Sequence, residues 1–130
     1  MWNILVVDDN FLNRKLILEI LKNKAVCDSA ASVQEAIEAY KLSCQQNKPY
    51  DMVLLDIAMP EVSGIEFLKY VREDERKKGI LLGKGVLIIM VTAYKEHFLK
   101  SFDFGCDDYI LKPITSDVLM TKVEKYLSGK

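Results

Sequence analysis

Short apolar runs alternate with longer amphipathic segments along the chain, and the alternation occurs five times. Asn3–Val7, Asp51–Leu55 and Val86–Val91 are nearly continuous apolar runs, as in strands that a parallel sheet buries on both faces. Weaker runs of the same kind lie at Ala25–Ala30 and Tyr109–Leu111. We therefore expect five strands, and we expect Val86–Val91, the most hydrophobic run, to be central in the sheet.

The segment after each strand places apolar residues at helical spacing. Leu12, Leu16, Ile20 and Leu21 form the apolar pattern of the first helix. Capping boxes at residues 32–35 (SVQE) and 63–66 (SGIE) predict where the second and third helices begin. A short fourth helix is expected over residues 95–104, and a last one from Thr115 or Ser116 through Leu127. The residues of these later helices expected to carry the apolar face are Ala36, Ile37, Ala39, Tyr40, Phe67, Leu68, Val71, Val118, Leu119, Val123 and Leu127.

This order of elements predicts the fold class. Strands that alternate with helices imply a parallel sheet, right-handed crossovers and helices on both faces. We predict an α/β, doubly wound (βα)5 fold, flavodoxin-like, with strand order 2-1-3-4-5 and a single domain over residues 1–130. The connection Lys77–Gly85 is unusually long. Its Ile80, Leu81 and Leu82 are expected to fold back on the body, because three consecutive exposed aliphatic residues are uncommon.

Composition and charge narrow the classes of function. The 130 residues suit one domain, and 18 basic against 19 acidic residues leave a net charge of −1. Such a balance gives no electrostatic footprint for nucleic acid or an anionic membrane. No apolar run is long enough to cross a bilayer, and the first residues do not resemble a signal peptide. Cys27, Cys44 and Cys106 lack metal-ligand spacing, so we expect reduced thiols in a cytoplasmic protein.

Polar residues stand at the carboxyl ends of four of the five strands. Asp8 and Asp9 follow the first strand, Asp56 the third, Thr92 the fourth and Lys112 the fifth. Ligands of open doubly wound sheets bind at this edge, where the strand order reverses. The first and third strands are neighbours in the order 2-1-3-4-5, so we expect the three carboxylates to converge.

Three ionised carboxylates repel one another and require positive charge. A divalent cation and the ammonium of Lys112 together would neutralise the site. Mg²⁺ fits this donor set, because it is a small hard ion that binds through one or two carboxylates, waters and a phosphate. No thiolate or imidazole cluster favours zinc or another soft-ligand metal.

Taken together, these motifs resemble the receiver family of two-component signalling, which includes the chemotaxis regulators. The resemblance covers essentially the whole chain, and its specificity comes from the order of the motifs, since none of them is specific alone. The matching residues are Asp8-Asp9, Asp56 followed by Met59-Pro60, Gly64, Thr92-Ala93, and Tyr109 three residues before Lys112-Pro113.

The resemblance implies a role for each acidic residue. Asp56 would take a phosphoryl group from a phosphohistidine, carried by a sensor histidine kinase or a histidine phosphotransfer protein, or from a small acyl phosphate. Asp9 and Asp56 would hold Mg²⁺ directly, and Asp8 would act mostly through a bound water. The backbone carbonyl of Ala58 would complete the protein ligands.

It also implies how the site would signal. Lys112 would pair with Asp56 at rest and with the phosphoryl oxygens afterwards, and a cis bond before Pro113 would aim the lysine into the site. Thr92 would donate to the phosphoryl group and move toward it, and Tyr109 would follow into the vacated space. The domain is then a switch with self-catalysed transfer to and from Asp56, rather than an enzyme with a turnover substrate.

The surface that reports the change would be the fourth helix, fifth strand and fifth helix. Its expected residues are Lys95, Lys100, Tyr109, Val118 and Lys122. This surface would bind a downstream protein target, and a phosphorylation-dependent dimer remains open.

Two positions depart from many members of the family. Ala58 and Tyr94 stand where polar side chains can orient an attacking water, so we expect a long-lived phosphorylated form that Ala58→Asn or Tyr94→Glu would shorten. His97, near the start of the short helix, reads as a solvated side chain, and Asp107-Asp108 as a turn.

Three other classes of protein share part of this pattern. A haloacid-dehalogenase-like phosphatase needs a second acid where Ala58 stands. A flavodoxin-like electron carrier needs a Ser/Thr/Gly-rich phosphate loop, and Asp8-Asp9-Asn10 occupies that position. An unphosphorylated pseudo-receiver would not need the acidic pair, Asp56, Thr92 and Lys112 together.

Overall fold

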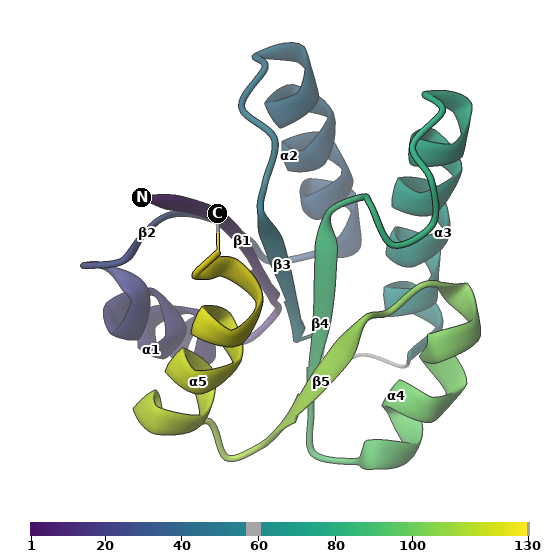
Figure 1. Cartoon of the computed structure of the whole chain (residues 1–130). Coiled ribbons are helices and arrows are strands. Elements are labelled where there is room, and N and C mark those ends of the chain that lie inside the picture. Colours follow the sequence, from purple (N-terminus) through teal and green to yellow (C-terminus); the bar gives the residue numbers. More distant parts are fainter. Residues whose placement is uncertain (57–60, 130) are drawn as a thin grey trace.

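The computed structural model describes the backbone of residues 1–56 and 61–129 and the side chains of residues 1–56 and 64–129. Five strands alternate with five helices, as predicted (Figure 1). In the described part of the chain no helix is both long enough and apolar enough to span a bilayer. The elements are β1 (Trp2–Asp8), α1 (Phe11–Leu21), β2 (Ala25–Ala30), α2 (Val33–Gln45), β3 (Met52–Asp56), α3 (Glu61–Lys77), β4 (Leu87–Thr92), α4 (Lys95–Ser101), a 3₁₀ turn (Phe102–Phe104), β5 (Asp108–Leu111) and α5 (Ser116–Leu127).

All described strands are parallel and lie in the order β2-β1-β3-β4-β5, which confirms the predicted flavodoxin-like topology. The middle strand is β3, and β4, predicted to be central, lies next to it with β5 on its other side. Strands with neighbours on both sides and helices on both faces bury nearly all of their side chains: β3 is buried throughout, and β4 is buried except at Leu87. This explains why the β3 and β4 sequences are continuous apolar runs rather than alternating ones.

Two hydrophobic cores of the described residues lie on opposite faces of the sheet. Successive strand residues point to opposite faces, so Ile4 and Val6 enter one core while Leu5 and Val7 enter the other. The core that holds Ile4 and Val6 is closed by α1 and α5, and the other by α2, α3 and part of α4. The residues that close the first core from the helices are Ile17, Leu21, Leu119, Val123 and Leu127, and those that close the second include Ala36, Tyr40, Phe67, Leu68 and Val71.

The predicted core faces of two helices are wrong in part. Leu12 and Leu16 of α1 are 71% and 44% exposed, and Ile17 is buried instead, whereas Leu21 is buried as predicted. The α1 sequence is apolar on more than one side, so periodicity alone does not identify which stripe the sheet covers. Val118 of α5 is 44% exposed as well. The buried side of that helix is formed by Leu119, Val123 and Leu127.

Helix starts follow local capping chemistry. Ser32 caps α2 with its side chain accepting from the Glu35 N–H at 3.1 Å, as the capping box predicts. The returning contact differs, because the Glu35 carboxylate accepts from the Ala31 N–H at 3.4 Å. Thr115 caps α5 as predicted. The third helix begins at Glu61, so Ser63 lies within its first turn rather than before it.

The predicted packing of the loop after α3 is also wrong. Leu81 and Leu82 are 73% and 95% exposed, and Ile80 is exposed as well. The Ile80 N–H bonds the Glu75 carbonyl and the Lys84 N–H bonds the Leu81 carbonyl, so two local turns carry these side chains away from the body. Local backbone bonds therefore decide the course of this loop.

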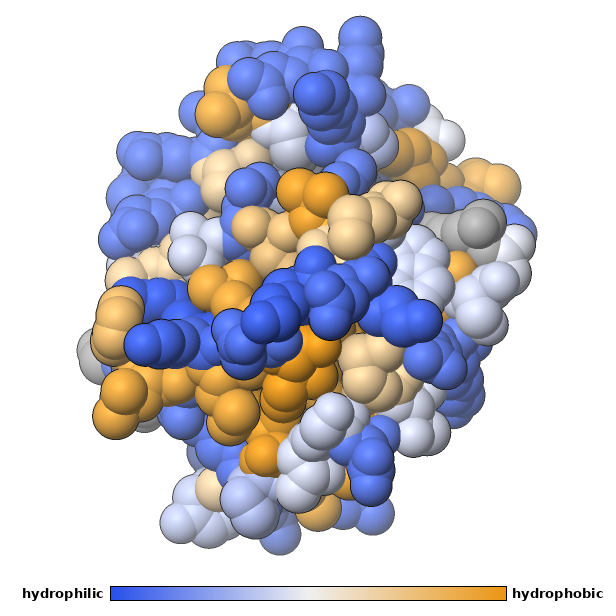
Figure 2. All heavy atoms as spheres, turned by 90° about the vertical axis from the view of Figure 1, so that its left-hand side faces the viewer, coloured by the Kyte–Doolittle hydropathy of each residue, from blue (hydrophilic) through white to orange (hydrophobic). Residues whose placement is uncertain are grey.

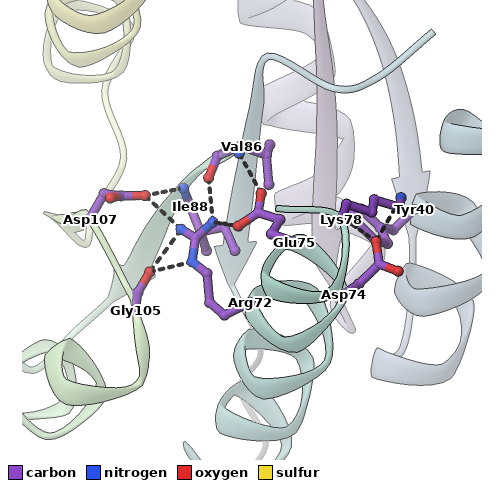
Figure 3. A network of polar contacts seen from close by, with 9 residues as sticks. All are labelled: Tyr40, Arg72, Asp74, Glu75, Lys78, Val86, Ile88, Gly105 and Asp107. Atoms are coloured by element: carbon purple, nitrogen blue, oxygen red, sulfur yellow. Dashed lines mark hydrogen bonds and ion pairs between the residues drawn. The ribbon is translucent and has the colours of Figure 1, made fainter. Parts of the chain in front are cut away.

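An ion-pair network joins α3 to the amino ends of β4 and β5 (Figure 3). The Arg72 guanidinium donates to Glu75, to Asp107 and to the carbonyls of Val86 and Gly105, at 2.8 to 3.0 Å. The five N–H donors of the planar Arg72 guanidinium thereby join three segments of the chain, which are α3 and the residues before β4 and β5.

Two carboxylates extend this network to the strands. Glu75 accepts from the Val86 N–H and Asp107 from the Ile88 N–H, each at 2.8 Å. Glycine is required beside the network, since a Cβ at Gly85 would collide with the Glu75 carboxylate. Gly105 has φ +100°, and a Cβ there would lie 2.8 Å from the Arg72 side chain. Asp107 is thus a structural anchor and not a plain turn residue.

We expect Arg72→Met to lower the free energy of unfolding by about 2–3 kcal/mol, because it removes the donor to one oxygen of the buried Glu75 carboxylate and to the carbonyls of Val86 and Gly105. The matched control is Arg76→Met, whose ion pair with Glu73 is exposed and is expected to change stability by less than about 0.5 kcal/mol. Urea unfolding measures both. Equal losses in the two variants would contradict the structural role of Arg72.

Candidate functional site

Two carboxylates meet at the carboxyl ends of β1 and β3. Asp8 and Asp56 are paired in the parallel register, and both are buried. The loop after Asp8 is held by its own polar contacts: the Asp8 carboxylate accepts from the Asn10 N–H at 2.8 Å, and Arg14 donates to the Asp8 carbonyl at 2.7 Å. Asn10 in turn caps α1 through the Asn13 N–H. The strand end and the helix start therefore fix one carboxylate beside the other.

The electrostatics of this pair are unfavourable in part. Lys112 Nζ lies 2.8 Å from Asp56 Oδ1, which supplies one positive charge. Among the described residues, Asp8 Oδ2 and Asp56 Oδ2 have no hydrogen-bond partner. Burial, followed by the neighbouring Asp8 carboxylate, raises the pKa of Asp56 well above its usual range, although Lys112 opposes the shift. The site is thus short of positive charge.

The donor set fits a small hard cation. Two buried carboxylate oxygens without partners are the atoms that a cation at the end of β1 and β3 would contact. The described residues contain no group of three carboxylate, imidazole or thiolate side chains placed to hold a metal ion. Asp8 and Asp56 meet as expected, whereas Asp9 is exposed and its part in the site stays a prediction. Ala58, predicted to contribute its carbonyl, lies outside the described residues.

Lys112 reaches the site from the end of β5. Its backbone N–H donates to the Thr92 carbonyl at 2.8 Å, which holds the ends of β4 and β5 together beyond the last ladder pair. The Lys112–Pro113 peptide bond is cis, as predicted. The lysine side chain is partly exposed and its ammonium reaches the buried Asp56.

Thr92 ends β4 with a buried hydroxyl that is bonded to the start of the next helix. Its Oγ1 accepts from the Tyr94 N–H at 3.1 Å and lies 3.1 Å from His97 Nδ1. The prediction that His97 is a solvated side chain is therefore wrong. Its position as the third residue of α4 was the available signal, because a side chain there can reach back to the residues before the helix.

Tyr109, the predicted partner of Thr92 in switching, is half-buried on β5. Its ring lies 4.9 Å from that of Phe98 on α4, and the Lys122 ammonium of α5 lies 5.8 Å from its centroid. Lys122 also pairs with Asp108, which accepts from the Tyr126 hydroxyl at 2.6 Å. The ring of Tyr109 thus lies where α4, β5 and α5 adjoin, and Asp108 belongs to the strand rather than to a turn.

The pKa of Asp56 predicts how stability responds to pH. A carboxyl whose pKa is higher in the folded than in the unfolded state loses stability as pH rises between those two values. Without divalent cations, Asp56→Asn is expected to raise the unfolding temperature by several degrees at pH 7.5, on the order of 1–2 kcal/mol. The advantage should shrink toward pH 5, where the wild-type carboxyl is protonated.

Thermal unfolding of both proteins with a chelator at several pH values checks this expectation. Asp103→Asn, at an exposed acid of the same charge, is the control and should show no such pH-dependent advantage. An Asp56→Asn variant that is less stable than the wild type at pH 7.5 would contradict the strained carboxylate pair.

The comparisons with known proteins agree with this geometry. Residues 4–124 match the family model described as the response regulator receiver domain. The chain is 34% identical over 95% of its length to the hybrid signal transduction histidine kinase L of Dictyostelium discoideum, of which it spans 7%. Among solved structures it is similar to the response regulator TrrA of Thermotoga maritima in complex with Mg²⁺ and BeF (32% identity, 98% and 100% of the two chains, TM-score 0.75). It is also similar to the receiver domain of Saccharomyces cerevisiae Ssk1, crystallised with the histidine phosphotransfer protein Ypd1 (27% identity, 96% and 88% of the chains, TM-score 0.77). The chain belongs to the response regulator receiver domain family.

Proposed function

We propose that this domain is a Mg²⁺-dependent phosphorylation switch in the cytoplasm, with Asp56 as the residue that takes up the phosphoryl group. The observation that carries the proposal is the buried Asp8–Asp56 pair, with two unpartnered oxygens and Lys112 beside it. A pair of repelling carboxylates costs stability. Its presence at the ligand-binding edge of the sheet favours a role in chemistry over a role in folding.

The proposed transfer needs little from the protein beyond placement and charge. An oxygen of Asp56 forms a bond to phosphorus while the donor's P–N bond breaks, and its electron pair stays on the donor imidazole. Lys112 Nζ, already 2.8 Å from Asp56 Oδ1, would then neutralise a phosphoryl oxygen. Thr92 would donate its hydroxyl to another.

Asp8 and Asp56 would hold Mg²⁺, together with Asp9 and the carbonyl of Ala58. The ion supplies charge neutralisation for the phosphoryl oxygens when it is bound. It also makes the ionised form of Asp56 more favourable, and that form is the nucleophile.

The phosphodonor would be a sensor histidine kinase or a histidine phosphotransfer protein. The kinase similarity and the neighbour crystallised with Ypd1 support this class of partner. On this chain, α1 is the face best placed to receive it, because Phe11, Leu12 and Leu16 are exposed on the helix that begins beside Asp8. Figure 2, which faces the side of Figure 1 that carries α1, shows a hydrophobic area there next to hydrophilic residues.

The downstream protein target would read the surface formed by α4, β5 and α5. Tyr109 packs against Phe98 there, and Val118 and Lys122 lie on α5. In Figure 1 α4 lies far from α1 whereas α5 lies beside it, so a target that keeps to α4 and β5 would leave the donor's face free.

The same surface could also form a phosphorylation-dependent dimer of the domain. Tyr94 is exposed and remains placed to slow dephosphorylation.

We expect acetyl phosphate with Mg²⁺ to add the mass of one phosphoryl group to the wild type. Asp56→Asn should gain nothing, because it lacks the nucleophilic carboxylate, and a chelator should abolish the gain in the wild type. Intact mass spectrometry measures all three. The same gain in the Asp56→Asn variant would contradict Asp56 as the acceptor.

A further inference from the structure

His97 contacts the hydroxyl that the proposed function assigns to the phosphoryl group. The Nδ1 atom of its half-buried ring lies 3.1 Å from Thr92 Oγ1. The Tyr94 ring packs on it with centroids 5.3 Å apart at 62°, so the imidazole is held from a second direction. Its backbone N–H bonds the Tyr94 carbonyl, and its carbonyl accepts from Ser101. The imidazole therefore belongs to the ordered start of α4.

The contacts around Thr92 use the one hydrogen of its hydroxyl and at least one of its two lone pairs. A threonine hydroxyl has one hydrogen and two lone pairs. One lone pair accepts from the Tyr94 N–H at 3.1 Å, and the Tyr94 carbonyl lies 3.3 Å away. With Nδ1 as acceptor, the hydroxyl hydrogen goes to His97. With Nδ1 protonated, the second lone pair accepts from it and the hydrogen goes to the Tyr94 carbonyl. Both tautomers engage the hydroxyl.

We propose that His97 is a positioning residue that holds Thr92 in its resting conformation and competes with the phosphoryl group for its hydroxyl. The inference rests on the proposed function of Asp56. Because His97 lies on α4, the release of Thr92 changes a contact of the surface that the target would read. The phosphorylation site and that surface are then joined through the short segment from Thr92 to His97.

The size of the effect follows from the loss of one hydrogen bond. When the imidazole is absent, a ligand that favours the released Thr92 does not have to break the contact between Thr92 and His97. The net contribution of one hydrogen bond corresponds to about 2- to 10-fold in an equilibrium constant. We therefore expect His97→Ala to bind a phosphoryl mimic about 2- to 10-fold more tightly than the wild type.

The test measures the affinity for beryllofluoride, a stable mimic of the phosphoryl group, by titration in the presence of Mg²⁺. His97→Asn is the rescue variant, because its amide places polar atoms near the position of Nδ1 and should restore the wild-type affinity. Glu96→Ala, at an exposed neighbour on the same helix, is the control and should also match the wild type. A thermal unfolding scan of each variant establishes that it is folded.

A second readout follows the imidazole itself. His97 is the sole histidine of the sequence, so its ring nitrogens give unambiguous NMR signals. The Nδ1 signal should move when beryllofluoride binds, and it should move in the same direction in unliganded Thr92→Val, which lacks the hydroxyl.

The outcomes separate the two proposals. Equal affinities of His97→Ala and the wild type would overturn the role of His97, as would equal tightening in His97→Ala and His97→Asn. An Nδ1 signal that does not respond to beryllofluoride would overturn it too. A wild type that binds no beryllofluoride would instead overturn the proposed function, and the role of His97 with it.

Discussion

Two like charges are buried side by side at the ends of β1 and β3, and this constraint organises the functional half of the molecule. Water would solvate Asp8 and Asp56 far better than a protein interior can. The fold brings them together because parallel strands end at the same edge of the sheet. Lys112 supplies part of the missing positive charge, and the raised pKa of Asp56 reports that the compensation is incomplete.

The other end of the sheet shows the opposite arrangement. There Arg72 is surrounded by acceptors, and both Glu75 and Asp107 are bonded to it and to N–H groups at or just before the start of β4 (Figure 3). Charges at the amino ends of β4 and β5 are therefore matched, and charges at the carboxyl ends of β1 and β3 are not. The fully hydrogen-bonded network around Arg72 holds the helices and strands together, whereas the carboxylate pair keeps unpartnered oxygens that a ligand can bind.

The sequence was sufficient to predict the topology and the polar residues at the strand ends. Buried parallel strands appear as continuous apolar runs, and the first polar residue after each run marks where the strand ends. It was insufficient for details that local geometry decides. Leu12 and Leu16 are apolar at helical spacing yet exposed, since several stripes of α1 could face the sheet. The loop at Leu82 turns outward because of two backbone bonds that no pattern of hydrophobicity encodes.

Within the site, the sequence predicted that the carboxylates at the ends of β1 and β3 would meet, but not the direction of the Asp9 side chain. Asp8 and Asp56 are neighbours because the strand order makes them so, whereas the direction of Asp9 depends on the turn that follows β1. The position of His97 as the third residue of α4 indicates that its side chain can reach back, but not which group it contacts. Its contact with Thr92 depends on the tight turn between β4 and α4.

The central claim is that the buried carboxylate pair exists to bind a divalent cation, and thermal unfolding with and without Mg²⁺ tests it most directly. A ligand at ten times its dissociation constant stabilises the folded state by about 1.4 kcal/mol, which is several degrees for a domain of this size. We expect Mg²⁺ to stabilise the wild type by this amount and Asp8→Asn much less. Asp8→Asn keeps the oxygen that accepts from Asn10 but removes a charge that the ion needs. An equal effect of Mg²⁺ on both proteins, or none on the wild type, would contradict the account.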